Sequence, residues 1–259
     1  MLYNVIHIKN DIVNHIKEKR PFSLVRIGDG DLKLIGSLIK NQSNEAKFQR
    51  SGIPNEKGKF ILNIYKNACN NSNYTSSFEM YYTNEFWYRH FSKGTQKKIV
   101  NWKKMYKRVG IVNENYCNPE IGYLLFLSYV NLLNDLKEKR ICLITCFPGI
   151  DKMLKSNGYD AFTIIIPGVN QNHFSKYNEI INKIKRVVND TDIFLIGGGV
   201  LGRGYCDIVK ENGGVAVDIG QVMNTWKNKI IPPRFKNILI SEGLLFNLSK
   251  PAQKYKDYI

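Results

Sequence analysis

The chain has 259 residues, of which 43% are hydrophobic and 23% are charged, close to the values of ordinary globular proteins. This composition excludes a disordered chain, and 20 glycines, 8 prolines and 5 cysteines exclude a collagen-like chain or a disulfide scaffold. The longest apolar run, over 121–133, is shorter than the ~20 residues that a membrane-spanning helix needs. The first 20 residues lack the apolar core of a signal peptide. We therefore expect a cytoplasmic protein.

The net charge of +16 comes from 38 basic and 22 acidic residues. Such an excess fits a polyanionic partner, namely nucleic acid, an anionic membrane surface or phosphate groups. It also fits a chain rich in Lys, Asn, Ile and Tyr, whose codons are all AT-rich. The overall charge leaves these alternatives open, so local clusters of charge are the better guide.

The first half of the chain favours helices. Ile8, Ile12 and Ile16 recur at helical spacing and predict an opening amphipathic helix. The elements expected up to residue 138 are a helix over 4–19, a strand over 22–27, a sharp turn at 28–31, a helix over 32–39, a polar loop over 41–58, a mostly helical stretch over 59–107 broken at 70–77, a strand over 109–112 and an apolar helix over 121–138.

The second half alternates regularly between short apolar runs and helical patterns. Strands are expected over 141–145, 162–166, 193–196 and 215–217, and helices over 148–157, 174–188 and 200–211. This alternation is typical of βαβ units and a parallel sheet. We predict one α/β domain over 1–259: a Rossmann-like, mostly parallel sheet with flanking helices and a helical, basic middle region at about 59–138.

The first candidate site is the segment Arg26-Ile27-Gly28-Asp29-Gly30-Asp31, between a strand and a helix. The carboxyl ends of strands in open α/β sheets are where ligands bind. Two carboxylates one residue apart suit Mg²⁺ or Mn²⁺, which proteins hold with one or two carboxylates plus substrate phosphates. Gly28 and Gly30 permit positive φ, and Arg26 supplies a bidentate donor for an anion. The alternative is a tight turn with a purely structural role, built from Asp and Gly.

The second candidate site is the glycine run at 197–199, which follows a strand and opens a helix. Its backbone N–H groups would face an anion, and Arg203 lies in the first turn of the helix. The segment 197–202 also matches the GxGxxG pattern of dinucleotide-binding folds, with Asp218 at the end of the next strand. The pattern comes late in the chain, with only one clear strand after it. Phosphate binding, dinucleotide binding and a structural turn therefore remain open.

The third candidate is the segment 86–108, which carries eight basic residues and no acid, interleaved with aromatic residues. Such a pattern fits single-stranded nucleic acid, an anionic membrane or a sugar-bearing acceptor. It also fits an ordinary helix pair with a lysine face in solvent and aromatic side chains in the core. The spacing of Trp102 and Tyr106 favours packing. We therefore expect no specific nucleic-acid binding from this segment.

Three stretches resemble bacterial glycosyltransferases of the GT-D fold. RIGDGD at 26–31 is similar to the RxGDGE-type motif of that family, and DIFLIGGGVLGRGYCDIVKENGGVAVDIG at 192–220 resembles its closing unit. NHFSKYNEI at 172–180 is similar to the segment that precedes a helix in the family. The resemblance implies a Rossmann-like fold that transfers a sugar from a nucleotide donor, typically a UDP-sugar, with a divalent metal.

Residue by residue, the resemblance implies a set of roles in this chain. It implies a metal site for Mn²⁺ or Mg²⁺ at Asp29 and Asp31, with Asp31 in place of the usual Glu. The expected catalytic residues are Asp31, from the resemblance, and Asp218, from its place at a strand end. The expected nucleotide-sugar-binding residues are Arg26, Gly28 and Asn172, which match the family's segments, and Gly198, Gly199 and Arg203, which belong to the glycine run and helix start described above. The family's acidic stretch is absent at 221–226, so no general base can be assigned there.

We predict a metal-dependent glycosyltransferase of the hexosyltransferase type. Its partners would be a nucleotide-sugar donor, a glycan or glycoconjugate acceptor and, through the basic segment, the inner face of an anionic membrane. Two rivals remain. One is a nucleotide enzyme of the oxidoreductase type that uses the late glycine run, and the other is a non-enzymatic module that binds polyanions.

Overall fold

The computed structural model describes residues 3–39, 57–79, 89, 91–128, 130–168 and 173–229. Seven strands form one sheet in the order β3-β2-β1-β7-β6-β4-β5, and every pairing is parallel. Their bounds are β1 Phe22–Val25, β2 Tyr74–Ser76, β3 Tyr116–Cys117, β4 Arg140–Thr145, β5 Asp160–Ile165, β6 Ile193–Gly197 and β7 Val215–Asp218. The expected α/β fold with a parallel sheet is confirmed.

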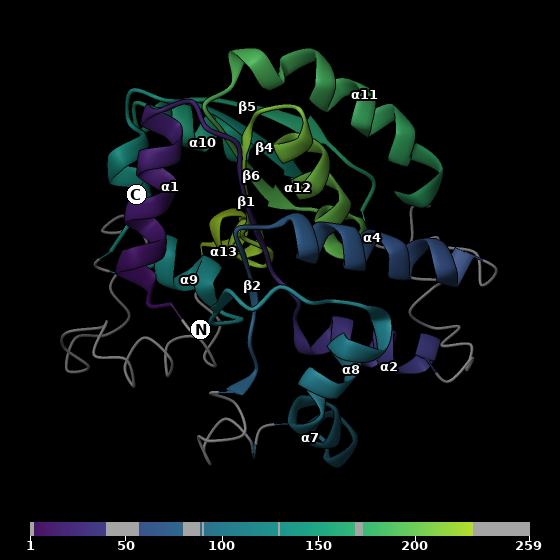
Figure 1. Ribbon diagram of the computed structural model, residues 1–259. Coiled ribbons are helices and arrows are strands. Elements are labelled where there is room, and N and C mark those ends of the chain that lie inside the picture. The colour runs from purple at the N-terminus through teal and green to yellow at the C-terminus, as the bar shows by residue number, and fades with distance from the viewer. Residues whose placement is uncertain are drawn as a thin grey trace.

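The sheet is buried on both faces, which explains why its central strands read as continuous apolar runs. β4 from Ile141 to Ile144 and β6 from Ile193 to Ile196 are fully buried. One face is covered by α4 (Gly58–Asn71), α11 (Tyr177–Val187) and α12 (Gly202–Glu211). The other is covered by α1 (Val5–Lys17), α9 (Ile121–Phe126), α10 (Ile150–Ser156) and α13 (Val222–Asn228), as Figure 1 shows.

A separate group of helices lies beyond the carboxyl ends of the strands. α2 (Asp29–Ile39) leaves β1 there, and α7 (Lys93–Val100) and α8 (Trp102–Val109) pack against it in the lower part of Figure 1. Trp102 and Tyr106 are buried, as their spacing predicts, while the neighbouring lysines point outward. The group therefore stands beside the edge of the sheet where α/β proteins bind ligands.

The middle region differs from the expectation because it adds two strands to the sheet. β2 lies within the stretch 70–77, where the sequence predicts only a break between helices. The prediction of a strand at 109–112 is wrong, because the strand forms instead at Tyr116–Cys117. Gly110 ends α8 in a left-handed conformation, with φ at 78°. The side chain of Asn113 then donates to two backbone carbonyls near the end of α4. The chain therefore begins to pair with β2 only after this residue.

The apolar helix expected over 121–138 is also interrupted. α9 ends at Phe126, and a 3₁₀ helix, η2 (Leu132–Leu136), follows. The Ser128 hydroxyl donates to the Leu124 carbonyl at 2.5 Å and accepts from the Val130 N–H at 3.1 Å. Because short polar side chains compete with the helical hydrogen-bond ladder, this local pairing ends the helix.

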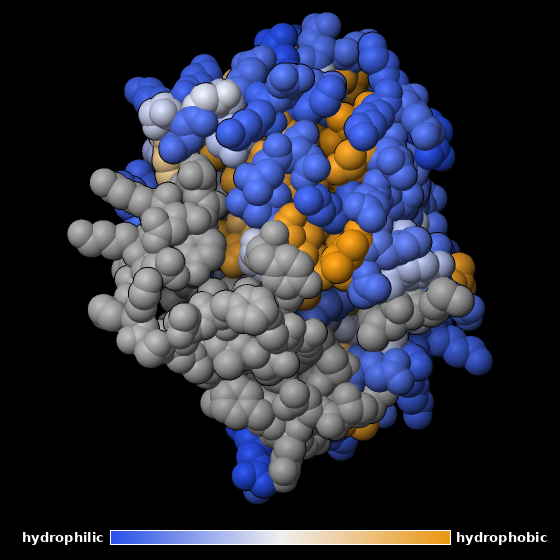
Figure 2. All heavy atoms as spheres, turned by 90° about the vertical axis from the view of Figure 1, so that its left-hand side faces the viewer, coloured by the Kyte–Doolittle hydropathy of each residue, from blue (hydrophilic) through white to orange (hydrophobic). Residues whose placement is uncertain are grey.

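The surface on the side of α1 is mostly hydrophilic where it is described, and hydrophobic side chains gather in the upper and central part of the view (Figure 2). Within the described ranges, none of the helices combines the length and the hydropathy that crossing a bilayer requires.

Candidate functional site

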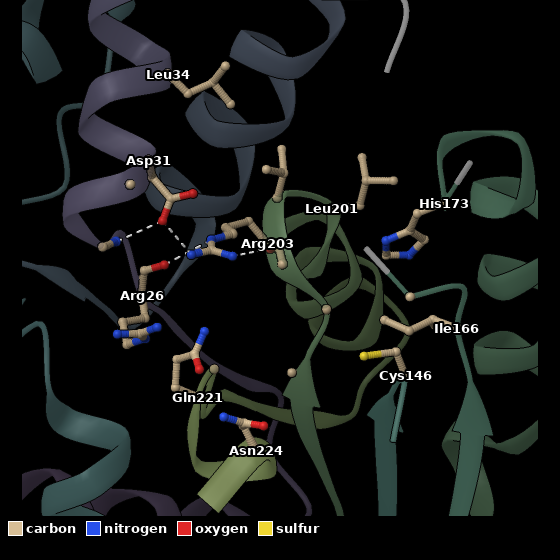
Figure 3. A pocket seen from close by; sticks show the side chains of 18 of the residues that line it. Arg26, Asp31, Leu34, Cys146, Ile166, His173, Leu201, Arg203, Gln221 and Asn224 are labelled. Carbon is tan, nitrogen blue, oxygen red and sulfur yellow. Dashed lines mark hydrogen bonds and ion pairs between the residues drawn. The ribbon is translucent and has the colours of Figure 1, made fainter. Parts of the chain in front are cut away.

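A pocket of about 490 Å³ lies at the carboxyl edge of the sheet. β1 and β7 meet there side by side, although they come from opposite ends of the described chain. The lining residues follow β1, β3, β4, β5, β6 and β7, and Figure 3 shows side chains from several of these segments converging. They include Arg26, Gly28, Asp29, Asp31, Glu120, Cys146, Phe147, Ile166, His173, Gly198, Gly199, Leu201, Arg203, Gln221 and Asn224. The position agrees with the general rule for ligand sites in such sheets.

Arg203, from the first turn of α12, connects three elements around the pocket. Its side chain is 5% exposed. Nε donates to the carbonyl of Arg26 at 2.9 Å and lies 3.5 Å from Oδ2 of Asp218. Nη2 donates to Oδ2 of Asp31 at 2.6 Å, and Nη1 donates to the Gly199 carbonyl. Each nitrogen of the guanidinium thus already has a partner within the protein.

Asp31 is correspondingly engaged. Its Oδ2 accepts from Arg203 and from the Gly28 N–H at 2.8 Å, and its Oδ1 accepts from the Tyr65 hydroxyl at 2.6 Å. Burial and the Asp31 charge raise the pKa of Tyr65 well above its ordinary value, so that hydroxyl stays a donor. Neither Gly28 nor Gly30 uses the positive φ that glycine permits, and α2 begins at Asp29, within the segment predicted to be a turn. Asp31 therefore anchors the start of α2.

Arg26 directly follows β1 and lines the pocket. Its Nη1 donates to the Pro119 carbonyl at 3.1 Å and lies 3.8 Å from a carboxylate oxygen of Glu120. The guanidinium also packs on Gly220, which has φ of +50° and leaves no room for a Cβ. Nε is buried and has no hydrogen-bond partner among the described residues. This orphaned donor marks Arg26 as a group available to an anion.

Asp218 lies behind the pocket rather than in its lining, because its residue is only 1% exposed. One carboxylate oxygen accepts from the Gly220 N–H at 3.1 Å, and the other faces Arg203. Burial raises the pKa of Asp218, against the opposing charges of Arg203 and Arg26. Its catalytic role stays a prediction, and the burial favours a positioning role through Arg203 and the 218–220 turn.

The glycine run turns tightly where β6 ends. Gly199 has φ of +57°, and a Cβ on Gly198 would come within 2.7 Å of the Gly202 Cα. A short 3₁₀ turn, η5 (Gly199–Leu201), separates the run from α12. The close approach of two backbone segments is thus one reason for the glycines, independent of any ligand.

We expect NADH not to bind with micromolar affinity, despite the GxGxxG match. In dinucleotide folds an acidic residue about 20 positions after the glycines bonds the ribose. The corresponding Asp218 is buried against Arg203 and cannot reach a ribose. A fluorescence titration with NADH measures this directly, and saturable micromolar binding would favour the oxidoreductase alternative.

The charges around the pocket leave a place for a cation. Carboxylates at Asp29, Asp31, Glu120 and Asp218 outnumber the guanidinium groups at Arg26 and Arg203. Asp29, at the start of α2, is half-buried, lines the pocket and has no ion pair with any described residue. Adding a diphosphate to this net negative site requires a compensating positive charge.

The donor set fits a divalent metal in one respect and not in another. Over the part of the chain that the structure describes, no three His, Cys, Asp or Glu side chains form a metal cage. Mg²⁺ and Mn²⁺ are commonly held by one or two carboxylates plus substrate phosphates, which Asp29 and a donor diphosphate can supply. Asp31 would have to share oxygens that Arg203, Gly28 and Tyr65 already use.

The pocket brings together most residues that the sequence singled out. Arg26, Gly28, Asp29, Asp31, Gly198, Gly199 and Arg203 all line it, while Asn172 lies outside the described residues. The sequence did not indicate the lining residues Glu120, Cys146, Phe147, Ile166, Gln221 and Asn224. It also did not indicate Tyr65, whose hydroxyl donates to Asp31. Cys146, Phe147 and Ile166 directly follow strands β4 and β5, so the rule on strand ends could have found them. Tyr65 lies inside α4 and carried no signal in the sequence.

Solved structures share this fold over the length of the chain. One is a domain of unknown function 1792, described as having a distinct glycosyltransferase fold, with TM-score 0.52, 14% identity, and coverage of 100% of this chain and 93% of that one. Another is a new glycosyltransferase with the same domain from Streptococcus sanguinis, with TM-score 0.51, 17% identity, and coverage of 98% and 88%. The fold is therefore that of a GT-D-type glycosyltransferase.

The family follows from the sequence comparison. The GT-D fold-like domain model matches residues 92–226, just over half of the chain. The chain belongs to the GT-D fold-like family. The match includes the glycine run and Asp218, whereas Arg26, Asp29 and Asp31 precede it. No curated protein matches the chain.

Proposed function

We propose that the protein is a divalent-metal-dependent glycosyltransferase that moves a hexose from a nucleotide-sugar donor, a UDP-sugar, to a glycan or glycoconjugate acceptor. The observation that carries the proposal is the pocket at the junction of β1 and β7. There the orphaned Arg26 donor, the Asp29 carboxylate, which no described residue pairs, and the glycine run line one cavity. The glycosyltransferase fold of the chain supports it.

The chemistry asks for positive charge near the leaving group, because negative charge accumulates on the diphosphate as the glycosidic bond breaks. Arg26 can offer Nε to a phosphate oxygen while Pro119 and Glu120 hold the rest of its guanidinium. Arg203 acts indirectly, because it holds Asp31 and the glycine run in place. The Gln221 and Asn224 amides line the pocket and suit sugar hydroxyl groups.

A divalent cation, Mn²⁺ or Mg²⁺, would be held by Asp29 together with the donor phosphates, and would supply Lewis-acid stabilisation of the leaving diphosphate. Asp31 contributes by fixing the start of α2, on which Asp29 lies. The proposal thus keeps both aspartates in the site and divides their roles between binding a cation and positioning the helix.

A donor screen tests the proposal. Thermal unfolding is followed with UDP, GDP, ADP and UDP-sugars, each with and without Mn²⁺. A ligand at 100 times its Kd adds about 2.7 kcal/mol of stability. We expect UDP or a UDP-sugar to stabilise the protein only when Mn²⁺ is present. Stabilisation by none of these nucleotides would contradict the proposal.

The basic helices α7 and α8 are proposed to face an acceptor or an anionic membrane surface. Lys97, Lys104 and Lys107 are exposed, and α7 and α8 pack on α2, the helix that begins at the pocket. The aromatic residues Trp102 and Tyr106 are buried, so they offer nucleic acid no stacking platform. This favours a peripheral contact over the polyanion-binding alternative.

Replacing Lys97, Lys104 and Lys107 with Gln is expected to weaken binding to phosphatidylglycerol vesicles by about 100-fold at low salt, since each lysine near an anionic bilayer contributes ~1 kcal/mol. Hydrolysis of the donor should change little, because these lysines lie outside the pocket lining. Vesicle sedimentation and a donor-hydrolysis assay measure the two effects.

The matched control replaces Lys152, Lys155 and Lys185 with Gln. These exposed lysines lie on α10 and α11, so the net charge changes equally at a different place. If both triple variants lose the same affinity, overall charge rather than the α7–α8 surface accounts for vesicle binding.

A further inference from the structure

The pocket has two chemically different halves. The half beneath α2 carries the charged groups Arg26, Asp29, Asp31, Glu120 and Arg203. The other half is built by residues that follow β4 and β5 and by η5, namely Cys146, Phe147, Ile166, Pro167, Val200 and Leu201. Figure 3 shows this division, with Asp31 and Arg26 on one side and Cys146, Ile166 and Leu201 on the other. The glycine run lies between the halves.

The two halves are separated along the sheet edge by a known number of strands. In the order β1-β7-β6-β4, Leu201 follows β6, two strands from the charged half, and Cys146 follows β4, three strands from it. At about 4.8 Å per strand, the separation is on the order of 10–14 Å. This span suits an extended nucleoside diphosphate, with its phosphates at one end and its base at the other.

Polarity indicates which end of the donor each half receives. A hexose carries a hydroxyl on most of its carbons. A buried apolar surface would leave those hydroxyl groups without hydrogen-bond partners, which costs free energy. A nucleobase has two apolar faces and only a few hydrogen-bonding groups on its edge. Apolar walls with a small number of placed polar groups are what such a ligand needs. The apolar half therefore fits the base better than the sugar.

His173 supplies the placed polar group. It lines the pocket, is 7% exposed, and its Nε2 lies 2.8 Å from the Tyr205 hydroxyl. Tyr205 is itself held by stacking on Tyr177, with ring centroids 5.3 Å apart. Burial lowers the pKa of His173 to about 4, so the ring is neutral near pH 7. Among the described residues, Nδ1 has no partner, which leaves it free for a ligand.

Resting on the function proposed above, we propose that the donor's nucleobase binds in the apolar half of the pocket, between Phe147, Ile166 and Leu201, with Nδ1 of His173 hydrogen-bonded to its edge. The diphosphate then spans the glycine run toward Arg26 and Asp29, and the sugar lies toward Gln221 and Asn224. His173 is in this arrangement a donor-recognition residue and takes no part in the bond changes.

Cys146 allows a test on the unmodified protein. It is half-buried in the apolar half, whereas the other four cysteines are buried. The rate of its alkylation by iodoacetamide is measured by peptide mass spectrometry with Mn²⁺ alone, with Mn²⁺ and pyrophosphate, and with Mn²⁺ and UDP. We expect UDP to slow alkylation at least tenfold and pyrophosphate to leave it unchanged, because pyrophosphate carries no base.

A second measurement examines His173. His173→Phe is expected to weaken UDP binding about tenfold, the loss of one buried hydrogen bond, while Mn²⁺-pyrophosphate affinity stays within about twofold. His173→Gln, which keeps a hydrogen-bonding group, should recover part of the loss. Tyr205→Phe should have a smaller effect in the same direction, since it only frees the ring that Tyr205 orients.

The outcomes separate this inference from the proposed function. If UDP binds with Mn²⁺ but neither protects Cys146 nor responds to His173→Phe, the base lies elsewhere and the inference is overturned while the function stands. If pyrophosphate protects Cys146 as well as UDP does, the two halves are assigned the wrong way round. If neither UDP nor pyrophosphate binds, the proposed function fails and the inference with it.

Discussion

Arg203→Met is expected to lower the free energy of unfolding by about 3–5 kcal/mol, the cost of breaking a buried ion pair from one side. Met has a similar volume and no charge, so the variant leaves Asp31 and Asp218 facing each other's negative charge without the guanidinium between them. It also removes the donors to the carbonyls of Arg26 and Gly199. Equilibrium urea denaturation measures the loss.

Arg203→Lys is the matched control. It keeps the positive charge, but a single ammonium group cannot reach Asp31, Asp218 and two carbonyls at once. An intermediate loss is expected, with UDP affinity reduced because the glycine run is no longer held. A loss below about 1 kcal/mol for Arg203→Met would contradict the view that this side chain organises the site.

Asp29→Asn is expected to reduce sugar transfer by at least about 100-fold, because the substitution removes the carboxylate that would bind the cation. Stability should change by less than about 0.5 kcal/mol, since Asp29 is half-exposed and has no ion pair with a described residue. Steady-state transfer kinetics at saturating Mn²⁺ and urea denaturation together measure both quantities.

Asp31→Asn provides the contrast at a residue of the same type, two positions further along α2. Its carboxylate is bonded to Arg203, Gly28 and Tyr65, so this variant should lose stability as well as activity. If Asp29→Asn transfers sugar at the wild-type rate while Asp31→Asn alone is inactive with unchanged stability, Asp31 binds the cation and Asp29 does not.

The order of the elements was predictable because most of them follow simple periodicity. The alternating second half of the chain predicted four strands, and all four formed with ends close to those expected. The short strands β2 and β3 were not predictable, because three and two residues carry no period. β2 pairs with β1 and β3 pairs with β2, and each partner is far away in sequence. The break after α9 depended on Ser128, whose hydroxyl competes with the helical ladder.

The residues that make up the candidate site were easier to predict from the sequence than the role of each residue. Asp and Arg next to a strand end, together with glycines next to another, indicated a ligand site at one edge, and the pocket contains both. The partnership of Arg203 with Asp31 joins residues 172 positions apart, and no local pattern encodes it. The hydroxyl of Tyr65, which occupies one oxygen of Asp31, likewise comes from a helix interior.

The most direct test asks whether this pocket binds a nucleoside diphosphate through a divalent cation. UDP is titrated calorimetrically into the wild-type protein, first with Mn²⁺ and then with excess chelator. The carboxylates around the pocket outnumber its arginines, so a bare diphosphate should be repelled. We expect Mn²⁺ to tighten the Kd for UDP by about 100-fold, or about 2.7 kcal/mol. Equal affinities with Mn²⁺ and with chelator would contradict the proposal.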